Sequence, residues 1–181
     1  MKGLVFSEFI EMVEDTFGDD VADFIIEESA LPSGGAYTAV GTYDHSELVT
    51  LVKNLSDKVN IPVDKLTFTF GQHLARIFYK KYPDFFAECA NTLDFLKIVD
   101  NHIHVEVAKL YPDAELPKFT YDDSNPDKFE LHYESKRGFA DLAEGLIVGT
   151  SAHYNESFTI HREDYSTEDV CRVKFILHKQ D

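Results

Sequence analysis

Tryptophan is absent from this chain, and cysteine occurs only twice, as Cys89 and Cys171. Two cysteines cannot form a disulfide framework, so reduced thiols in the cytoplasm are the simpler expectation. No apolar run approaches the roughly 18 residues needed to cross a bilayer, and acidic Glu8 comes too early for a signal peptide. The sequence therefore predicts neither a disulfide-stapled secreted protein nor a membrane protein.

Basic residues are also scarce. The chain has 17 lysines and arginines against 33 aspartates and glutamates, which gives a net charge of −16. Like charges repel, which argues against binding to nucleic acid or to an anionic membrane surface. Basic protein partners stay open, although solubility alone would explain the charge equally well. Hydrophobic residues make up 44% of the 181 residues, enough for the core of one domain.

The spacing of apolar residues predicts helices first and a small sheet afterwards. The expected helices are 4–17, 19–29, 46–59, 64–82, 93–110 and 139–154, with a short turn or helix at 84–91. The expected strands are 118–121, 129–135, 157–162 and 170–178. Asp44 should cap the third helix, with Glu47 completing a capping box. The pattern indicates one α+β domain over 1–181, with a helical lobe (1–61) and a second lobe (62–181) where a helix packs on an antiparallel sheet.

The stretch from 100 to 137 carries the chemistry. His102 and His104 lie near the end of a predicted helix, and the sequence later reads Tyr-Glu-Ser-Lys-Arg. On a strand, Tyr133, Ser135 and Arg137 would share one face, and the other face would carry only charged side chains. A strand that is polar on both faces makes sense if it meets a polar ligand. Arginine and hydroxyl groups can hold carboxylates, so an imidazole with such a clamp suits a metalloporphyrin.

Helical geometry alone does not choose between the two histidines. His102 and His104 point about 200° apart at 3.6 residues per turn, so one of them at most faces a pocket. Apolar residues flank both of them, and periodicity leaves the choice open.

His104 stands thirteen residues before Pro117 and twenty-nine before the tyrosine of Tyr-x-Ser-x-Arg, and this arrangement resembles the haem-nitric oxide/oxygen binding (H-NOX) family. That family includes bacterial gas sensors and the haem domain of soluble guanylate cyclase, and the resemblance covers nearly the whole chain. It implies haem b (iron protoporphyrin IX) with His104 as the proximal ligand of the iron. It also implies that Tyr133, Ser135 and Arg137 hold the propionates while Pro117 presses on the ring. By themselves, Pro117 could equally be a strand-entry proline and Tyr133 a core residue.

The resemblance further implies that the haem is enclosed between a distal lobe (1–61) with the 139–154 helix and a proximal lobe (62–181). Oxygen-binding members carry a tyrosine nine residues after the clamp tyrosine, where this chain has Leu142. Leucine cannot donate the hydrogen bond that polarised bound dioxygen needs. We therefore expect selectivity for nitric oxide and carbon monoxide. The other residues that resemble the distal walls are Phe9, His73, Ile77 and Leu146, of which the histidine is a polar departure.

The implied function is that of a soluble sensor with five-coordinate ferrous haem. Nitric oxide would release His104 and shift the lobes, and the signal would pass to a separate histidine kinase or diguanylate cyclase. The chain shows no nucleophile–base pair, so no enzymatic reaction is expected. An alternative from another class is a non-haem binding module that uses the same cavity for an apolar carboxylic acid. A Soret absorption band in the purified protein would distinguish the two.

Overall fold

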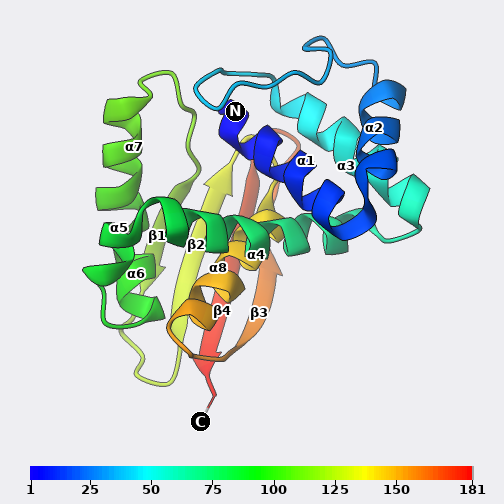
Figure 1. The fold of residues 1–181 in the computed structure, drawn as a ribbon. Coiled ribbons are helices and arrows are strands. Elements are labelled where there is room, and N and C mark those ends of the chain that lie inside the picture. The colour runs from blue at the N-terminus through cyan, green and yellow to red at the C-terminus, as the bar shows by residue number, and fades with distance from the viewer. Residues whose placement is uncertain (181) are drawn as a thin grey trace. The chain divides into compact units, whose positions relative to one another are not determined.

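The computed structural model describes residues 1–180, which Figure 1 draws as a ribbon. These residues form two compact units, 1–70 and 71 onward. The division falls inside α4 (Val63–Lys81), so this helix contributes to both units. The lobe boundary expected after residue 61 lies just before this helix, and the two-lobe assignment stays a prediction.

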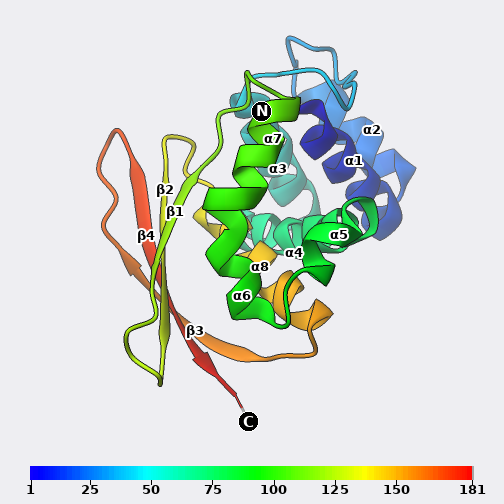
Figure 2. The ribbon, with the colours of Figure 1, turned by 90° about the vertical axis from the view of Figure 1, so that its left-hand side faces the viewer.

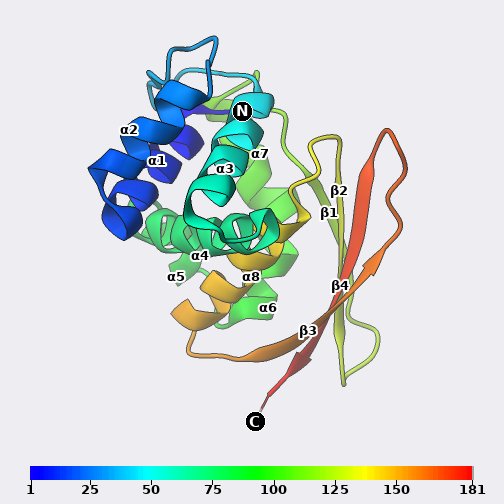
Figure 3. The ribbon, with the colours of Figure 1, turned by 90° about the vertical axis from the view of Figure 1, so that its right-hand side faces the viewer.

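The first unit is helical and contains α1 (Gly3–Phe17), α2 (Asp19–Glu28), α3 (His45–Val59) and the beginning of α4. Gly18 separates α1 from α2 with a φ of 94°, a backbone conformation that favours glycine. Figure 3 shows α1, α2 and α3 packed beside one another. Their buried faces carry the apolar residues that the helical spacing predicted, including Phe6, Phe9, Ile25, Leu51 and Leu55.

The start of α3 differs in one detail from the prediction. Asp44 caps the helix as expected, because its Oδ1 accepts a hydrogen bond of 2.8 Å from the backbone N–H of Ser46. The expected capping box is wrong, because the Glu47 carboxylate instead accepts hydrogen bonds from the hydroxyls of Ser33 and Tyr37. Glu47 is almost fully buried, so it ties the preceding loop to the helix.

The second unit combines short helices with one four-stranded antiparallel sheet in the order β1-β2-β4-β3. The strands are β1 (Lys118–Asp122), β2 (Phe129–Ser135), β3 (Phe158–Asp164) and β4 (Cys171–Lys179). The helices that follow α4 are α5 (Pro83–Ala87), α6 (Thr92–Ile98), α7 (His104–Leu110) and α8 (Ala140–His153). Figure 2 shows α6, α7 and α8 on the same side of the sheet. The α+β class is therefore confirmed.

The core of this unit lies between the sheet and α8. Tyr133 on β2 pairs with Phe119 on β1 and with Val173 on β4, and alternate residues along β2 and β4 are buried. The inward residues of these two strands are Phe129, Leu131, Tyr133, Val173, Phe175 and Leu177. The expectation that β2 is polar on both faces is wrong, because its tyrosine faces the apolar core with these residues.

The predicted helix over 93–110 is interrupted. A π-helical segment, η1 (Val99–Ile103), separates α6 from α7. A π-helical turn holds more residues than an α-helical turn, so it changes the phase of the helix faces that follow it. The interruption ends directly before His104, which is the first residue of α7. Within residues 1–180, no helix combines the length and the apolar character needed to cross a membrane.

Candidate functional site

His104 is held in a mostly buried environment beside the sheet. Its side chain is 18% exposed, and its ring lies 5.8 Å from the ring of Phe119. Its Nδ1 is buried without a hydrogen-bond partner in the described structure, 3.7 Å from Oδ1 of Asp100. Burial lowers the pKa of His104, and the charge of Asp100 and the carbonyl of Pro117 only partly oppose this shift. The neutral imidazole, which is the form that binds metals, is thereby favoured.

His102 has a different environment, although it lies on the same helical segment. Its side chain is 45% exposed, its Nε2 lies 3.6 Å from a carboxylate oxygen of Glu88, and its ring meets Phe85 edge-on. The structure therefore distinguishes the two histidines by their exposure to water, which helical periodicity could not do. His104 is the one whose imidazole is mostly shielded from water.

Arg137 lies in the turn after β2 and not on the strand. The prediction that Tyr133, Ser135 and Arg137 share one face of a strand is therefore wrong. The hydroxyl of Ser135 accepts the backbone N–H of Arg137 at 3.1 Å and shapes this turn. The Arg137 side chain is 15% exposed, and its guanidinium donates from Nη1 to the carbonyl of Glu115 at 3.0 Å and from Nη2 to its carboxylate at 2.7 Å. The arginine thus holds an oxygen pair with its two terminal nitrogens, and the Glu115 side chain is 81% exposed.

Tyr133 connects the sheet to the start of α8. Its side chain is 3% exposed, and its hydroxyl accepts the backbone N–H of Phe139 at 3.2 Å. Burial raises the pKa of Tyr133, so the phenol stays neutral. Its ring lies 5.6 Å from the ring of Phe119, which stands two residues after half-buried Pro117 in the chain. Tyr133 therefore contributes to the core whatever else it binds.

Within the second unit, the backbones of α4 and α8 approach each other closely at two glycines. A Cβ on Gly71 would lie 2.3 Å from the carbonyl oxygen of Leu142, and one on Gly149 would lie 2.5 Å from the Cβ of Ala75. The predicted distal residues follow this crossing in pairs one turn apart. The pairs are His73 with Ile77 on α4 and Leu142 with Leu146 on α8, and all four are half-buried.

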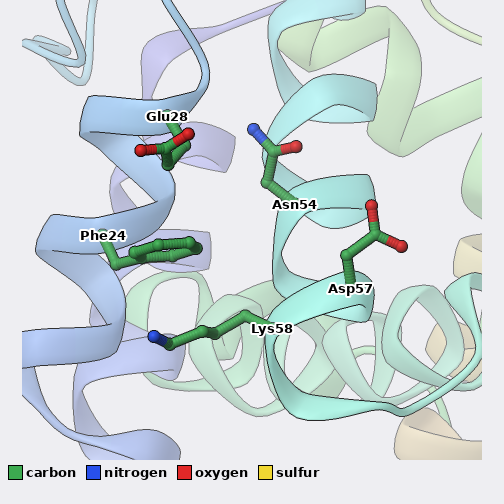
Figure 4. A pocket seen from close by; sticks show the side chains of 5 residues that line it. All are labelled: Phe24, Glu28, Asn54, Asp57 and Lys58. Atoms are coloured by element: carbon green, nitrogen blue, oxygen red, sulfur yellow. The ribbon is translucent and has the colours of Figure 1, made fainter.

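Phe9 belongs to the first unit. It is fully buried in α1 and meets Phe70 edge-on, with ring centroids 5.1 Å apart. A separate hollow of about 360 Å³ lies in this unit between α2 and α3 (Figure 4). Its wall includes Lys58, whose ammonium lies 3.9 Å from the ring centre of Phe24. None of the predicted site residues lines this hollow.

Two residues near the site were missed by sequence reasoning. Asp100 stands four residues before His104, a spacing that brings helical side chains together, so this signal was readable. Glu115 stands 22 residues before Arg137, and no local pattern predicts that contact. A partly shielded imidazole with an unpartnered buried nitrogen, together with an arginine that already holds a carboxylate, fits the donor set of a haem-binding domain.

The comparisons with known proteins give the family. The family model described as Haem-NO-binding matches residues 2–162, and the chain belongs to this H-NOX family, a haem-based gas sensor family related to soluble guanylate cyclase. The resemblance seen in the sequence is thereby confirmed. Members of this family bind haem, and their H-NOX domains are sensor modules and not catalytic domains.

Individual relatives agree with this assignment. The chain is 38% identical to the unliganded Fe(II) H-NOX protein from K. algicida, with a TM-score of 0.93 over 100% of this chain and 97% of that chain. It is 26% identical to an H-NOX protein from S. oneidensis in the Fe(II)NO state, with a TM-score of 0.90 and full coverage of both chains. It is also 22% identical over 178 residues to soluble guanylate cyclase gcy-35 of Caenorhabditis elegans. That alignment covers 96% of this chain and 24% of the cyclase, so the chain spans about a quarter of that relative.

Proposed function

We propose that this chain binds haem b through His104 and senses nitric oxide and carbon monoxide for a separate effector protein. The observation that carries the proposal is the environment of His104, a shielded imidazole whose Nδ1 is turned toward Asp100. With the proton on Nδ1, Nε2 is the nitrogen left for a metal. Haem supplies the iron that binds the gas, and the chain supplies one ligand to it.

The propionates have a partner of matching chemistry in Arg137. Its side chain is mostly buried, and its terminal nitrogens already hold a carbonyl and a carboxylate oxygen of Glu115. The Glu115 side chain is 81% exposed, so its carboxylate can return to water while another carboxylate takes its place at the arginine. Ser135 keeps the arginine in its turn. Tyr133 and Pro117 are the further residues that we propose to contact the porphyrin.

The gas preference follows from α8. Leu142 and Leu146 are apolar and give no donor to a bound oxygen molecule, whereas nitric oxide and carbon monoxide depend less on one. Ile77 on α4 adds apolar surface, and Phe9 of the first unit stays a proposed member of the same distal set. His73 is the one polar member of the predicted distal set.

Signalling would begin with release of His104. This residue opens α7 directly after η1, so its release frees a helix whose hydrogen bonding already departs from the α-helical pattern. Two arrangements of this segment would be the two states that an effector distinguishes. We propose a histidine kinase or a diguanylate cyclase as that effector, in the cytoplasm, where the free thiols of Cys89 and Cys171 stay reduced.

The test is spectroscopic. The purified, reduced protein should show a Soret band of five-coordinate ferrous haem, which shifts on addition of nitric oxide or carbon monoxide. A protein that is purified without haem and takes up none when haem is supplied would contradict the proposal. Binding of an apolar carboxylic acid by that haem-free protein, lost in Arg137→Ala, would support the alternative of a non-haem binding module.

A further inference from the structure

The carboxylate of Asp100 stands between a helix and a strand. Its Oδ1 accepts the backbone N–H of Phe119 at 2.9 Å, and the same oxygen lies 3.7 Å from Nδ1 of His104. Asp100 belongs to η1, and its side chain is 30% exposed. One oxygen atom therefore joins the π-helical segment, the imidazole and the beginning of β1.

The contact with Phe119 has a structural reason. β1 is an edge strand that pairs only with β2 in the described sheet, and alternate N–H groups of an edge strand point away from the sheet. The N–H of Phe119 is one that Asp100 accepts from outside the sheet. The ring of Phe119 meets His104 on one side and Tyr133 on the other. Movement of Asp100 would therefore change the hydrogen bond that holds the start of β1.

The contact with His104 is one small step from a hydrogen bond. A buried polar nitrogen without a partner costs free energy. Moving Nδ1 by about 0.7 Å would bring it to about 3.0 Å from the carboxylate, which is a normal hydrogen-bond length. Metal-binding histidines commonly donate their second N–H to a carboxylate, which fixes the tautomer and the orientation of the ring.

We propose that Asp100 is a positioning residue that orients His104 toward iron and links the release of His104 to the start of β1. The inference rests on the proposed function, because it assigns a role at the same site. While His104 is bound to metal, Asp100 holds its Nδ1–H. When His104 leaves, the ring moves relative to an oxygen that also holds Phe119, so the edge strand responds together with the helix.

The chain offers a matched control. Glu88 lies 3.6 Å from His102 on the same segment, a carboxylate–imidazole pair at nearly the same distance. The side chains of this pair are well exposed, at 61% for Glu88 and 45% for His102. Glu88→Gln therefore removes an equivalent charge near a histidine that is not expected to bind metal.

The experiment compares wild type, Asp100→Asn, Asp100→Ala and Glu88→Gln, each loaded with haem and reduced. We expect the iron–histidine stretching band in resonance Raman spectra to move to lower frequency in both Asp100 variants and to stay unchanged in Glu88→Gln. The rate of haem loss should rise about ten- to a hundredfold in Asp100→Ala, the usual effect of removing such a partner. The nearly isosteric Asp100→Asn keeps the test valid if the alanine variant does not fold.

A second readout does not involve iron. Hydrogen exchange at the Phe119 amide should be faster in Asp100→Ala than in wild type and Glu88→Gln, because the acceptor is gone. Unchanged Raman bands in the Asp100 variants, or an equal shift in Glu88→Gln, would overturn the orienting role, and unchanged Phe119 exchange would overturn the link to β1. A wild-type protein without any iron–histidine band would instead refute the proposed function itself.

Discussion

The residues around His104 and Arg137 are held by polar contacts, whereas those on α4 and α8 are held by backbone packing. Asp100, Ser135 and Glu115 surround the first group with oxygen atoms at hydrogen-bond or ion-pair distance. At the second group, Gly71 brings one helix against the main chain of the other. Under the proposed function, the first region would recognise its ligand through specific atoms, and the second region through shape and the lack of hydrogen-bond donors.

The largest expected effect is in the first region. His104→Ala or His104→Gly should remove the protein ligand of the iron and most of the haem, unless free imidazole is added to replace the side chain. Absorption spectra of the reduced variants check this, with His102→Ala as the control that should retain haem. A normal ferrous spectrum in His104→Ala would contradict the assignment.

The next effect concerns Arg137. Arg137→Ala should weaken haem retention more than Ser135→Ala does, because it removes a charged two-nitrogen partner and not one neutral bond. Haem transfer to an acceptor protein measures the rates. Glu115→Gln serves as the control, since it removes the internal ion pair and leaves the guanidinium in place. Equal rates in all variants and wild type would show that the arginine does not hold the propionates.

A smaller effect is expected in the second region. Without a donor at residue 142, the oxygen complex loses a bond worth about 1.5–3 kcal/mol, on the order of ten- to a hundredfold in affinity. The reduced protein, freed of reductant and exposed to air, should show no stable oxygen spectrum, while it binds nitric oxide and carbon monoxide. A persistent oxygen complex that disappears in His73→Leu would identify the histidine as a donor and refute the selectivity.

The smallest effect lies where the two regions join. Tyr133→Phe removes the hydroxyl that accepts the N–H of Phe139 at the start of α8, and this should lower the free energy of unfolding by about 1 kcal/mol. Urea denaturation measures the change, with exposed Tyr121→Phe as a control that should stay close to wild type. Faster haem loss in Tyr133→Phe with an unchanged free energy of unfolding would instead favour direct contact of the phenol with a propionate.

Much of the fold was readable from local patterns. The bounds of β2 were predicted as observed, and the helices and other strands were predicted to within a few residues, because each has a regular apolar spacing and a clear end. The π-helical segment was not predictable, since a change of helical pitch leaves no simple trace in the spacing of apolar residues. Periodicity could not choose between His102 and His104 because apolar residues flank both of them.

The candidate site was less predictable than the fold. The spacing of His104, Pro117 and Tyr133 identified the family, but the position of Arg137 on a strand was wrong because the strand ends at Ser135. A hydroxyl that accepts a backbone N–H two residues later favours a turn at that point, and this competes with strand pairing. The partner of Arg137 comes from a distant loop, and only the folded chain brings it near.

The close crossing at Gly71 has a consequence for how such domains can diverge. The glycine meets the carbonyl oxygen of Leu142 and not its side chain, so residue 142 can be exchanged without altering the contact. A methyl group at position 71 would force the two backbones about 1 Å apart, because carbon and carbonyl oxygen rarely approach closer than about 3.3 Å. The fold therefore separates two properties that evolution can vary one at a time, helix spacing through residue 71 and hydrogen bonding through residue 142.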